Sequence, residues 1–339
     1  MTRDSTPHDS HPPEFTRAGI DLAQPRLGAI ALAASDEFFA PRERLIQPDE
    51  PIFKPGVYDD HGKWMDGWES RRKRGPGHDW CIVRLAAAGR LFGVDIDTRH
   101  FTGNYPPEAS LDGCVWYGSD SPGAEADWRP LLTRSRLHGD SHNWFTIADD
   151  GVCTHVRLNI FPDGGVARLR LYGRIAIDWS RHARSERLDL AAMANGGRPV
   201  ACNDAHYGQP GNLIAPDRGI NMGDGWETRR RREPGFDWAI LELGHPGVVE
   251  EILVDTAHFK GNYPDRCSIQ AAHVDGLDDA ALIAASEHWP LLLPERKLEA
   301  DREHRFTEGL AALGPVSHVR LNIFPDGGVS RLRMFGTIA

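Results

Sequence analysis

The stretch HVRLNIFPDGGVARLRLYG occupies residues 155–173, and it returns as HVRLNIFPDGGVSRLRMFG at residues 318–336. In each copy, polar and apolar residues alternate on both sides of a Phe-Pro-Asp-Gly-Gly segment. Alternation with a period of two is typical of half-buried β-strands. Pro, Asp and Gly in succession favour a tight turn. The stretch therefore predicts a strand, a turn and a second strand, and it predicts them twice in one chain.

Two further blocks recur in the same order. DGWESRRKRGPGHDW at 66–80 returns as DGWETRRRREPGFDW at 224–238, and DTRHFTGNYP at 97–106 returns as DTAHFKGNYP at 255–264. Long matching blocks in a fixed order indicate a tandem duplication. The expected divisions are, in order, a flexible leader, a first repeat, a charged linker and a second repeat: residues 1–20, 21–177, 178–188 and 189–339.

The rest of each repeat also reads as strand. Residues 80–85, 91–96 and 248–254 are rich in β-branched, aromatic and other apolar side chains and are bounded by Gly, Pro and Asp. Helix is expected only in the opening Asp-Leu-Ala segments, which begin at Asp21 and within 188–195, and over 278–286. Two glycines end the segment at 188–195. Many short strands with turn-rich connections favour an all-β fold of two tandem antiparallel jelly-roll sandwiches with a few short helices. A doubly wound parallel sheet is disfavoured.

Composition excludes several classes of partner. The chain carries 49 acidic against 39 basic residues, a net charge of -10, which disfavours nucleic acid and anionic membrane surfaces as partners. No apolar run approaches the roughly 20 residues that a membrane-spanning helix needs. The five cysteines form no Cys-x-x-Cys pair, so we expect small buried side chains in a reducing cytoplasm rather than a disulfide framework.

The basic run after each Asp-Gly-Trp-Glu segment is unusual in an acidic protein. Guanidinium groups bind a carboxylate by two parallel hydrogen bonds, so the run is a candidate site for a small anion. The alternative is a solvated loop whose charges pair with nearby acids. The candidate anion-binding residues of the run are Arg71, Arg72, Arg229 and Arg230.

Candidate acid and base groups lie in the same blocks. Glu69 and Glu227 stand between an aromatic residue and the basic run, where burial and opposite charge compete in setting a pKa. They are candidate acid or base groups, or salt-bridge partners. His100 and His258 lie where a strand is expected to turn into a loop, and loops of this kind often carry sites. Turn chemistry is the alternative for both.

A metal site stays open. Carboxylates and imidazoles are common ligands of divalent metals, but no His-Glu-x-x-His or comparable spacing is present. No Walker loop, nucleophile elbow or dinucleotide fingerprint occurs either, so no nucleotide or organic cofactor is expected. The candidate metal ligands are Asp97, His100, Asp255 and His258.

One strand face is rich in hydrogen-bonding groups. His155, Arg157 and Asn159 share this face in the first repeat, and Arg320 is the counterpart of Arg157 in the second. A substrate-binding face and an internal polar network are both compatible with this pattern.

Taken together, DGWETRRRREPGFDW, DTAHFKGNYP, DLAAMANGG, NDAHYG and HVRLNIFPDGG resemble the allantoicase family, and the resemblance runs from about residue 20 to the end. It implies tandem jelly-roll domains of the galactose-binding-like type. It also implies hydrolysis of allantoate to ureidoglycolate and urea in the degradation of purines through allantoin. The copies differ, since Phe38 and Phe39 of the first stand where the second has His206 and Tyr207, so the two candidate sites need not be equivalent.

Allantoate has one carboxylate and two ureido arms on a single carbon, so it needs cations for the anion and acceptors for its N–H groups. Release of urea needs a proton on the departing nitrogen and a positioned water. With this substrate, His100 or His258 is expected as the acid or base, with Glu69 or Glu227 as its partner. The expected substrate-binding residues are Asp66, Arg71, Arg72, Asn104, Arg157, Asp224, Arg229, Arg230, Asn262 and Arg320.

A non-catalytic module that binds a small polar ligand or sugar is the alternative, because jelly-roll sandwiches often bind without turnover. It would use aromatic platforms and neutral amides rather than an Arg-rich, acid-containing pocket. A symmetric homo-oligomer is also expected, since two similar units present similar surfaces.

Overall fold

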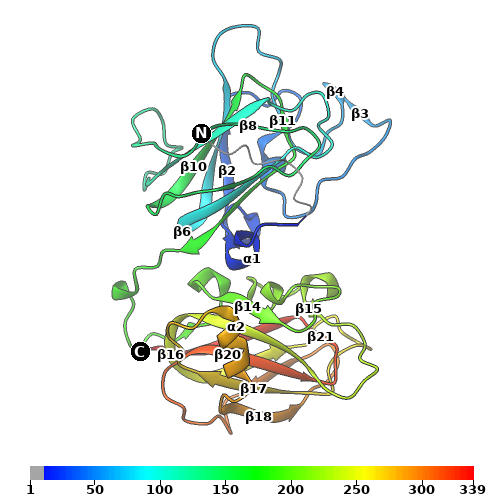
Figure 1. Ribbon diagram of the computed structural model, residues 1–339, viewed down its shortest axis with the longest axis vertical. Coiled ribbons are helices and arrows are strands. Elements are labelled where there is room, and N and C mark those ends of the chain that lie inside the picture. The colour runs from blue at the N-terminus through cyan, green and yellow to red at the C-terminus, as the bar shows by residue number, and fades with distance from the viewer. Residues whose placement is uncertain (1–10) are drawn as a thin grey trace. The chain divides into compact units, whose positions relative to one another are not determined.

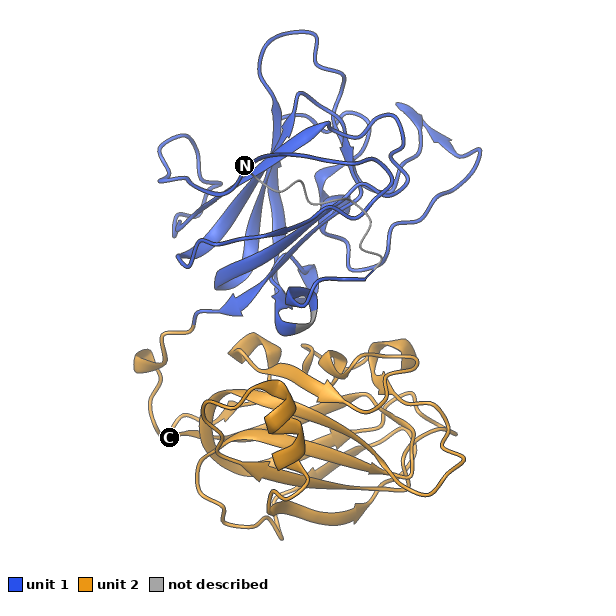
Figure 2. Cartoon of the chain, viewed as in Figure 1, with its two compact units in different colours: residues 1–176 blue, residues 177–339 orange. Residues whose placement is uncertain are grey.

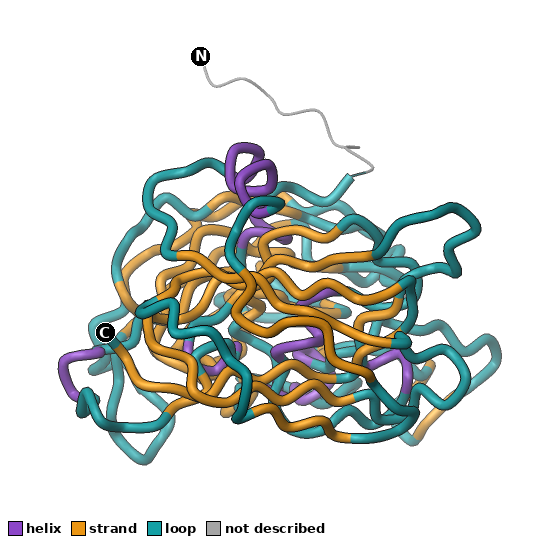
Figure 3. The backbone as a smooth tube through the Cα atoms, turned by 90° about the horizontal axis from the view of Figure 1, so that it is seen from below, coloured by secondary structure: helices purple, strands orange, loops and turns teal. Residues whose placement is uncertain are grey.

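The computed structural model describes residues 11–339 of the chain. These belong to two compact units, unit 1 (Met1–Ala176) and unit 2 (Ile177–Ala339), shown in separate colours in Figure 2. Strands dominate each unit and helices are short (Figure 3). All main strand pairings are antiparallel, which confirms the all-β prediction of two tandem sandwiches. None of the helices within 11–339 has the length and hydropathy to cross a membrane.

Unit 1 is built around one long strand, β6 (Asp79–Asp97), which takes part in two layers. Residues 79–84 pair with β10 on one side and β2 on the other. Residues 89–97 pair with β12, and 93–95 also pair with β9. The strands expected separately at 80–85 and 91–96 are therefore one continuous strand. The described elements of unit 1 are α1 (Phe15–Ala18), β1 (Ile20–Asp21), η1 (Pro25–Leu27), β2 (Ile30–Ala34), η2 (Arg42–Ile46), β3 (Tyr58–Asp59), β4 (Gly62–Lys63), β5 (Trp68–Glu69), β6, β7 (Glu108–Cys114), β8 (Arg129–Arg136), β9 (Trp144–Thr146), β10 (Val152–Phe161), β11 (Gly165–Val166) and β12 (Arg168–Ile175).

Unit 2 repeats this plan around β16 (Asp237–Asp255), which pairs with β14, β19, β20 and β22 as β6 pairs with their counterparts. Figure 1 labels β14, β16 and β20 in this unit. The remaining elements of unit 2 are η3 (Trp179–Arg181), β13 (Leu188–Asp189), η4 (Met193–Asn195), β14 (Arg198–Cys202), η5 (Pro210–Ile214), η6 (Met222–Asp224), β15 (Trp226–Glu227), β17 (Arg266–Ala272), α2 (Asp279–Ser286), β18 (Leu291–Lys297), β19 (Glu303–Phe306), β20 (Val316–Phe324), β21 (Gly328–Val329) and β22 (Arg331–Ile338).

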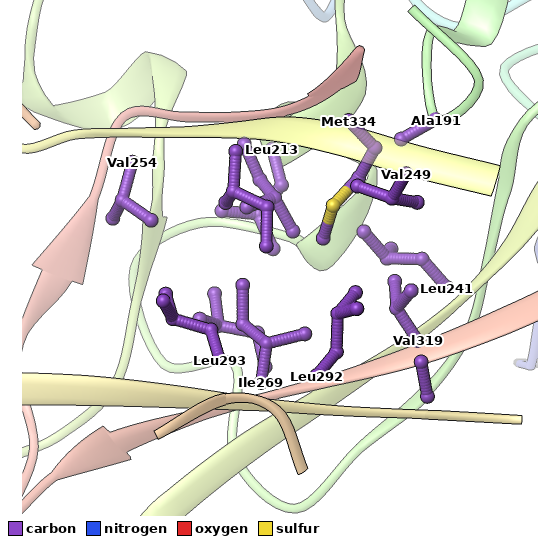
Figure 4. Packing of buried hydrophobic residues seen from close by; sticks show 14 of the residues in the cluster. Ala191, Leu213, Leu241, Val249, Val254, Ile269, Leu292, Leu293, Val319 and Met334 are labelled. Atoms are coloured by element: carbon purple, nitrogen blue, oxygen red, sulfur yellow. The ribbon is translucent and has the colours of Figure 1, made fainter. Parts of the chain in front are cut away.

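Each sandwich encloses its own apolar core. In unit 2, Ile269 of β17 and Val319 of β20 are fully buried, and they belong to one core cluster with Val254 of β16 and Met334 of β22 (Figure 4). Burial of this apolar surface is the main term that holds the two layers together. The turn segments that carry polar side chains are therefore attached to a rigid support.

The helix predictions have different outcomes. The helix at the opening of the first repeat is wrong, because Asp21 lies in β1 and only the single turn η1 follows, from Pro25 to Leu27. The helix at 278–286 is confirmed as α2, where the Asp278 side chain caps the first turn by accepting from Ala281 N at 2.8 Å. The helix at 188–195 is wrong, since it is replaced by β13 and the single turn η4. Here Asp189 Oδ1 accepts from Met334 N at 2.9 Å, which ties the segment to β22. Gly196 does end the turn, with φ of 85°.

The ends of the expected divisions also carry structure. Residues 1–10 of the expected leader lie outside the described residues, but Phe15 lies in α1 and its ring packs 5.6 Å from that of Tyr172. The expected linker contains η3, whose first turn is capped by Asp178.

The cysteines are separate and mostly buried. All five are free, and only Cys202 is partly exposed. Burial raises the pKa of the Cys267 thiol to about 12, so it is protonated and behaves as a small apolar side chain.

Candidate functional site

A cavity of about 360 Å³ lies in unit 1 beside the end of β5. Four segments form it: the loop that follows β2, the β3–β4 hairpin with the residues just after it, the strand β5, and the loop that follows β6. The cavity brings a carboxylate, an imidazole, an amide and an ammonium group to one place, which suits a small polar ligand. Its lining residues are Phe39, Lys63, Met65, Glu69, His100, Thr102, Gly103 and Asn104.

Glu69 is held rigidly at this cavity. Its backbone pairs with Gly165 in β11 and forms a bridge with Ala40 on the other side. The neighbouring Trp68 is fully buried, and its Nε1 donates to Asp36 O at 2.8 Å. Because successive side chains of a strand point to opposite faces, burial of the indole directs the carboxylate into the cavity.

Glu69 is 9% exposed as a residue, and its carboxylate accepts a hydrogen bond of 2.7 Å from Asn104 Nδ2. Burial raises its pKa above the ordinary value; the hydrogen bond from Asn104 opposes this, and the charges of Asp59 and Lys63 act in opposite directions. A glutamate of this kind accepts a proton more readily than one in water.

The Phe-Pro-Asp-Gly-Gly turn positions Asn104. Gly165 N donates to Asn104 O at 2.8 Å. The preceding Gly164 has φ of 139°, and a Cβ there would lie 2.8 Å from Asn104 O and 2.7 Å from Pro106 N. Only glycine allows the turn to approach the loop this closely. The segment is a turn, as predicted, and it also supports the site.

His100 lies at the rim of the same cavity in a left-handed backbone conformation, with φ of 70°. Its N–H donates to Asp140 Oδ1 at 2.8 Å, which holds that conformation. Its Nε2 lies 3.0 Å from Pro51 O. A carbonyl can only accept, so Nε2 carries the proton and Nδ1 has the free lone pair in the neutral ring.

Unit 2 repeats this arrangement. Asn262 Nδ2 donates to Glu227 Oε1, and Gly328 N donates to Asn262 O at 2.8 Å. His258 has φ of 72°, and its Nε2 lies 2.7 Å from Gly219 O. The Glu–Asn and His–carbonyl contacts are therefore the same in both units.

The two units differ in the segment before the Asp-Gly-Trp-Glu block. The carbonyls of Asp49 and Asp217 accept equivalent hydrogen bonds, from Arg168 and Arg331, so these aspartates are counterparts. From there to the Asp of the block, unit 1 has ten residues more than unit 2 (49 to 66 against 217 to 224). The extra residues form the β3–β4 hairpin, so the cavity wall made by this hairpin is specific to unit 1.

Asp66 and Asp224 are engaged in internal ion pairs rather than directed at the cavity. Asp66 Oδ2 accepts from Arg168 and from Ile52 N, both at 2.9 Å. Asp224 Oδ2 accepts from Arg331 at 2.9 Å. Arg168 is only 2% exposed although its place in the alternating pattern suggests a solvent-facing side chain. The geometry thus favours a structural role for both aspartates.

Two of the four candidate arginines of the basic run form ion pairs. Arg71 Nη2 lies 2.6 Å from Asp36 Oδ2, and Arg229 Nε lies 2.7 Å from Asp204 Oδ2. These ion pairs favour the alternative of a solvated, salt-bridged loop for both arginines. Arg72 and Arg230 are exposed and form no ion pair with another described residue, but neither lines the cavity.

The polar strand face forms internal networks. Arg157 pairs with Asp112 at 2.9 Å and lies over the Trp128 ring. Arg320 is 3% exposed, and it donates to Asn322 Oδ1 at 3.1 Å and Ser286 Oγ at 2.8 Å. These contacts favour the network interpretation of this face, away from the cavity residues.

The expected metal ligands are not brought together. Asp97 accepts from Arg99 at 2.6 Å, and Asp255 accepts from Arg218 at 3.1 Å. Among the described residues, the acidic group with metal-like spacing is Glu50, Asp97 and His142. Both acids of this group pair with Arg99. A guanidinium already neutralises them, so these side chains fit an ion-pair network better than a metal site.

Five lining residues are not among the site residues predicted from the sequence: Phe39, Lys63, Met65, Thr102 and Gly103. Lys63 and Met65 belong to the inserted hairpin or follow it directly. The ten additional residues between Asp49 and Asp66 are the sequence feature that could have indicated them, but a comparison of matching blocks contains only what the two halves share.

A family model described as "Allantoicase repeat" matches residues 20–176 and 188–339. "Probable allantoicase 1" of Burkholderia mallei (strain ATCC 23344) is 57% identical over 330 residues, which cover 97% of this chain and 98% of the relative. "Probable allantoicase" of Pseudomonas aeruginosa (strain LESB58) is 59% identical over 317 residues, with 94% and 95% covered. The crystal structure of allantoicase from Saccharomyces cerevisiae superposes with a TM-score of 0.80 at 34% identity, covering 95% of this chain and 94% of that one.

Proposed function

The chain belongs to the allantoicase family, and from this premise we propose that it hydrolyses allantoate to ureidoglycolate and urea in the degradation of allantoin. It is then a hydrolase of a C–N bond that is not a peptide bond. The observation that carries the assignment to a site is the buried Glu69 carboxylate, hydrogen-bonded to Asn104 at the cavity of unit 1. A cavity of about 360 Å³ is large enough for a ligand of this size.

Glu69 is the proton acceptor in this proposal. Its carboxylate takes a proton from a water molecule while the water oxygen bonds to the central carbon of allantoate. The bond from that carbon to one ureido nitrogen breaks, and Glu69 returns the proton to the departing nitrogen. The products are urea and ureidoglycolate, and Glu69 is again ionised. General acid–base catalysis of this kind contributes typically about 10²- to 10⁴-fold to a rate.

Asn104 and His100 position the reactants. The Asn104 amide nitrogen donates to Glu69 Oε1, and this bond holds the carboxylate in place. The amide oxygen of Asn104 can then accept a hydrogen bond from a ureido N–H of the substrate. His100, with its Nε2–H on Pro51 O, offers Nδ1 as a second acceptor. The geometry therefore supports Glu69 as the acid or base and His100 as its partner, the reverse of the order expected from the sequence.

We also propose a cytoplasmic homo-oligomer without a nucleic-acid partner. The net charge of -10 and the five free cysteines support the location and the absence of nucleic acid. The presence of two similar units supports symmetric assembly. Light scattering should give a mass of at least twice 37.7 kDa, and a mass of 37.7 kDa would contradict the proposed oligomer.

The test is release of urea from allantoate by the purified protein, with and without a chelator. We expect stoichiometric urea and ureidoglycolate. Binding of allantoate without turnover would instead favour the binding-module alternative. If the protein neither bound nor hydrolysed allantoate, the proposed function would be refuted.

A further inference from the structure

We infer that Lys63, on the hairpin found only in unit 1, binds the substrate carboxylate and makes unit 1 the unit that recognises the anion. The inference rests on the proposed function and adds a specificity-determining residue to it. Lys63 is the only ammonium or guanidinium group among the eight residues that line the cavity. An anionic substrate needs such a group, and Lys63 already lies at the cavity.

The hairpin holds Lys63 at the cavity. β3 and β4 pair with Tyr58 opposite Lys63, and Trp64 N donates to Val57 O at 3.0 Å to close the ladder. The Lys63 ammonium lies 4.5 Å from the centroid of the Phe53 ring. Figure 1 shows β3 and β4 at the periphery of unit 1. The aromatic contact directs the long side chain while its charge stays accessible.

The charge of Lys63 is available to a ligand. Within residues 11–339, no carboxylate forms an ion pair with it, and its field is felt at Glu69, where it opposes the effect of Asp59. Phe39 and Met65 supply apolar walls between these polar groups. A substrate carboxylate at Lys63 and a ureido arm at Glu69 would occupy the same cavity.

The arginines of the basic run do not supply this contact. Arg71 already pairs with Asp36, and its side chain is 62% exposed. It also lies over the Phe38 ring at 5.1 Å. Neither it nor Arg72 lines the cavity.

Unit 2 has no equivalent of this lysine. The segment from Asp217 to Asp224 lacks the hairpin residues. Lys260, which occupies the place of Thr102, lies 3.9 Å from Asp301, and its side chain is 78% exposed. The repeated Glu–Asn pairs thus differ in the cation beside them, and only the pair in unit 1 has a lysine free of acidic partners among the described residues.

The experiment compares K63Q with K63R, K54Q and K260Q. Lys54 lies in the same inserted segment, over the Trp64 ring at 4.3 Å, and does not line the cavity. Hydrogen bonds to charged groups are worth enough to change affinity by about 10- to 100-fold. We expect K63Q to raise KM for allantoate by this factor with a smaller change in kcat, K63R to recover part of the loss, and K54Q and K260Q to resemble the wild type.

A binding measurement separates this inference from the proposed function. Calorimetry with hydantoate, which has a carboxylate and one ureido arm, is compared with its neutral amide. The wild type should prefer the anion, and K63Q should lose that preference. An active wild type whose K63Q variant keeps both KM and the preference would overturn the inference alone. A wild type that binds hydantoate through Lys63 but releases no urea from allantoate would overturn the proposed function alone.

Discussion

Asn104 Nδ2 donates a hydrogen bond of 2.7 Å to Glu69 Oε1, and this bond joins the loop that follows β6 to strand β5 of the same unit. The same contact joins Asn262 to Glu227 in unit 2. A buried carboxylate is costly unless a donor satisfies it. The amide reduces that cost while the charge remains available for chemistry, so this pair links the stability of each unit to its function.

Glu69→Gln should abolish most of the activity and raise thermal stability at neutral pH. Gln has the same shape but cannot accept a proton, so kcat should fall by about 10²- to 10⁴-fold. Burial raises the pKa of Glu69, so ionisation of Glu69 destabilises the folded state above that pKa. The gain in Tm should therefore shrink as the pH falls toward the ordinary pKa of glutamate.

Calorimetric scans and urea assays of E69Q check this prediction, with E227Q as the matched variant in unit 2. An equal loss of turnover in both variants would mean that both units catalyse. A lower Tm for E69Q at neutral pH would contradict the cost assigned to the buried charge.

The pH profile of kcat/KM should show an acidic limb above the ordinary pKa of glutamate. The base must be ionised, so the rate is lost as the pH falls through the raised pKa of Glu69. Asn104→Ala removes a donor that favours the carboxylate, which raises that pKa further. The limb should then move to higher pH in N104A, and initial rates between pH 4 and pH 9 measure it. A limb that N104A leaves in place would assign it to another group.

Gly164→Ala should reduce activity by displacing Asn104. A Cβ at Gly164 would meet the backbone of residues 104–106 at 2.7 to 2.9 Å, in a backbone conformation that L-residues rarely adopt. Gly75→Ala is the matched control, because nothing lies within 4 Å of its Cβ. We expect G164A to lower kcat by about tenfold or more, in line with the effect of small misplacements on catalysis, and G75A to leave it unchanged. A fully active G164A variant would show that the turn does not position the amide.

The sequence predicted what the two repeats share and missed what separates them. The strand–turn–strand pattern at 155–173 predicts β10 and β12, and the matching blocks contain Glu69 and Asn104. Three features of the structure could not be predicted from the sequence: the continuity of β6, the burial of Arg168 and the role of the insertion that carries Lys63. β6 continues through residues 86–90 because hydrogen bonds to different partners support each half.

Some charged side chains also form hydrogen bonds with groups far away in the sequence, which a local sequence pattern does not indicate. Arg168 is buried because it donates to carbonyls and to an acid some hundred residues away. Lys63 lies on an insertion without a counterpart, so comparison of the halves passes over it. The residues of a repeat are thus easier to predict than the use that one copy makes of them.

Asp66→Ala should destabilise unit 1 far more than loss of an exposed ion pair. Arg168 is 2% exposed, and Asp66 supplies its carboxylate partner at 2.9 Å. Removing one partner of a buried pair leaves an uncompensated charge and costs roughly 3–5 kcal/mol. Arg71→Ala is the control, since it breaks the exposed pair with Asp36, and such pairs contribute about 0–1 kcal/mol. Urea unfolding followed by tryptophan fluorescence measures both. If D66A and R71A lowered the free energy of unfolding equally, Asp66 would not be the main counterion of Arg168, and its assignment as a substrate-binding residue would return.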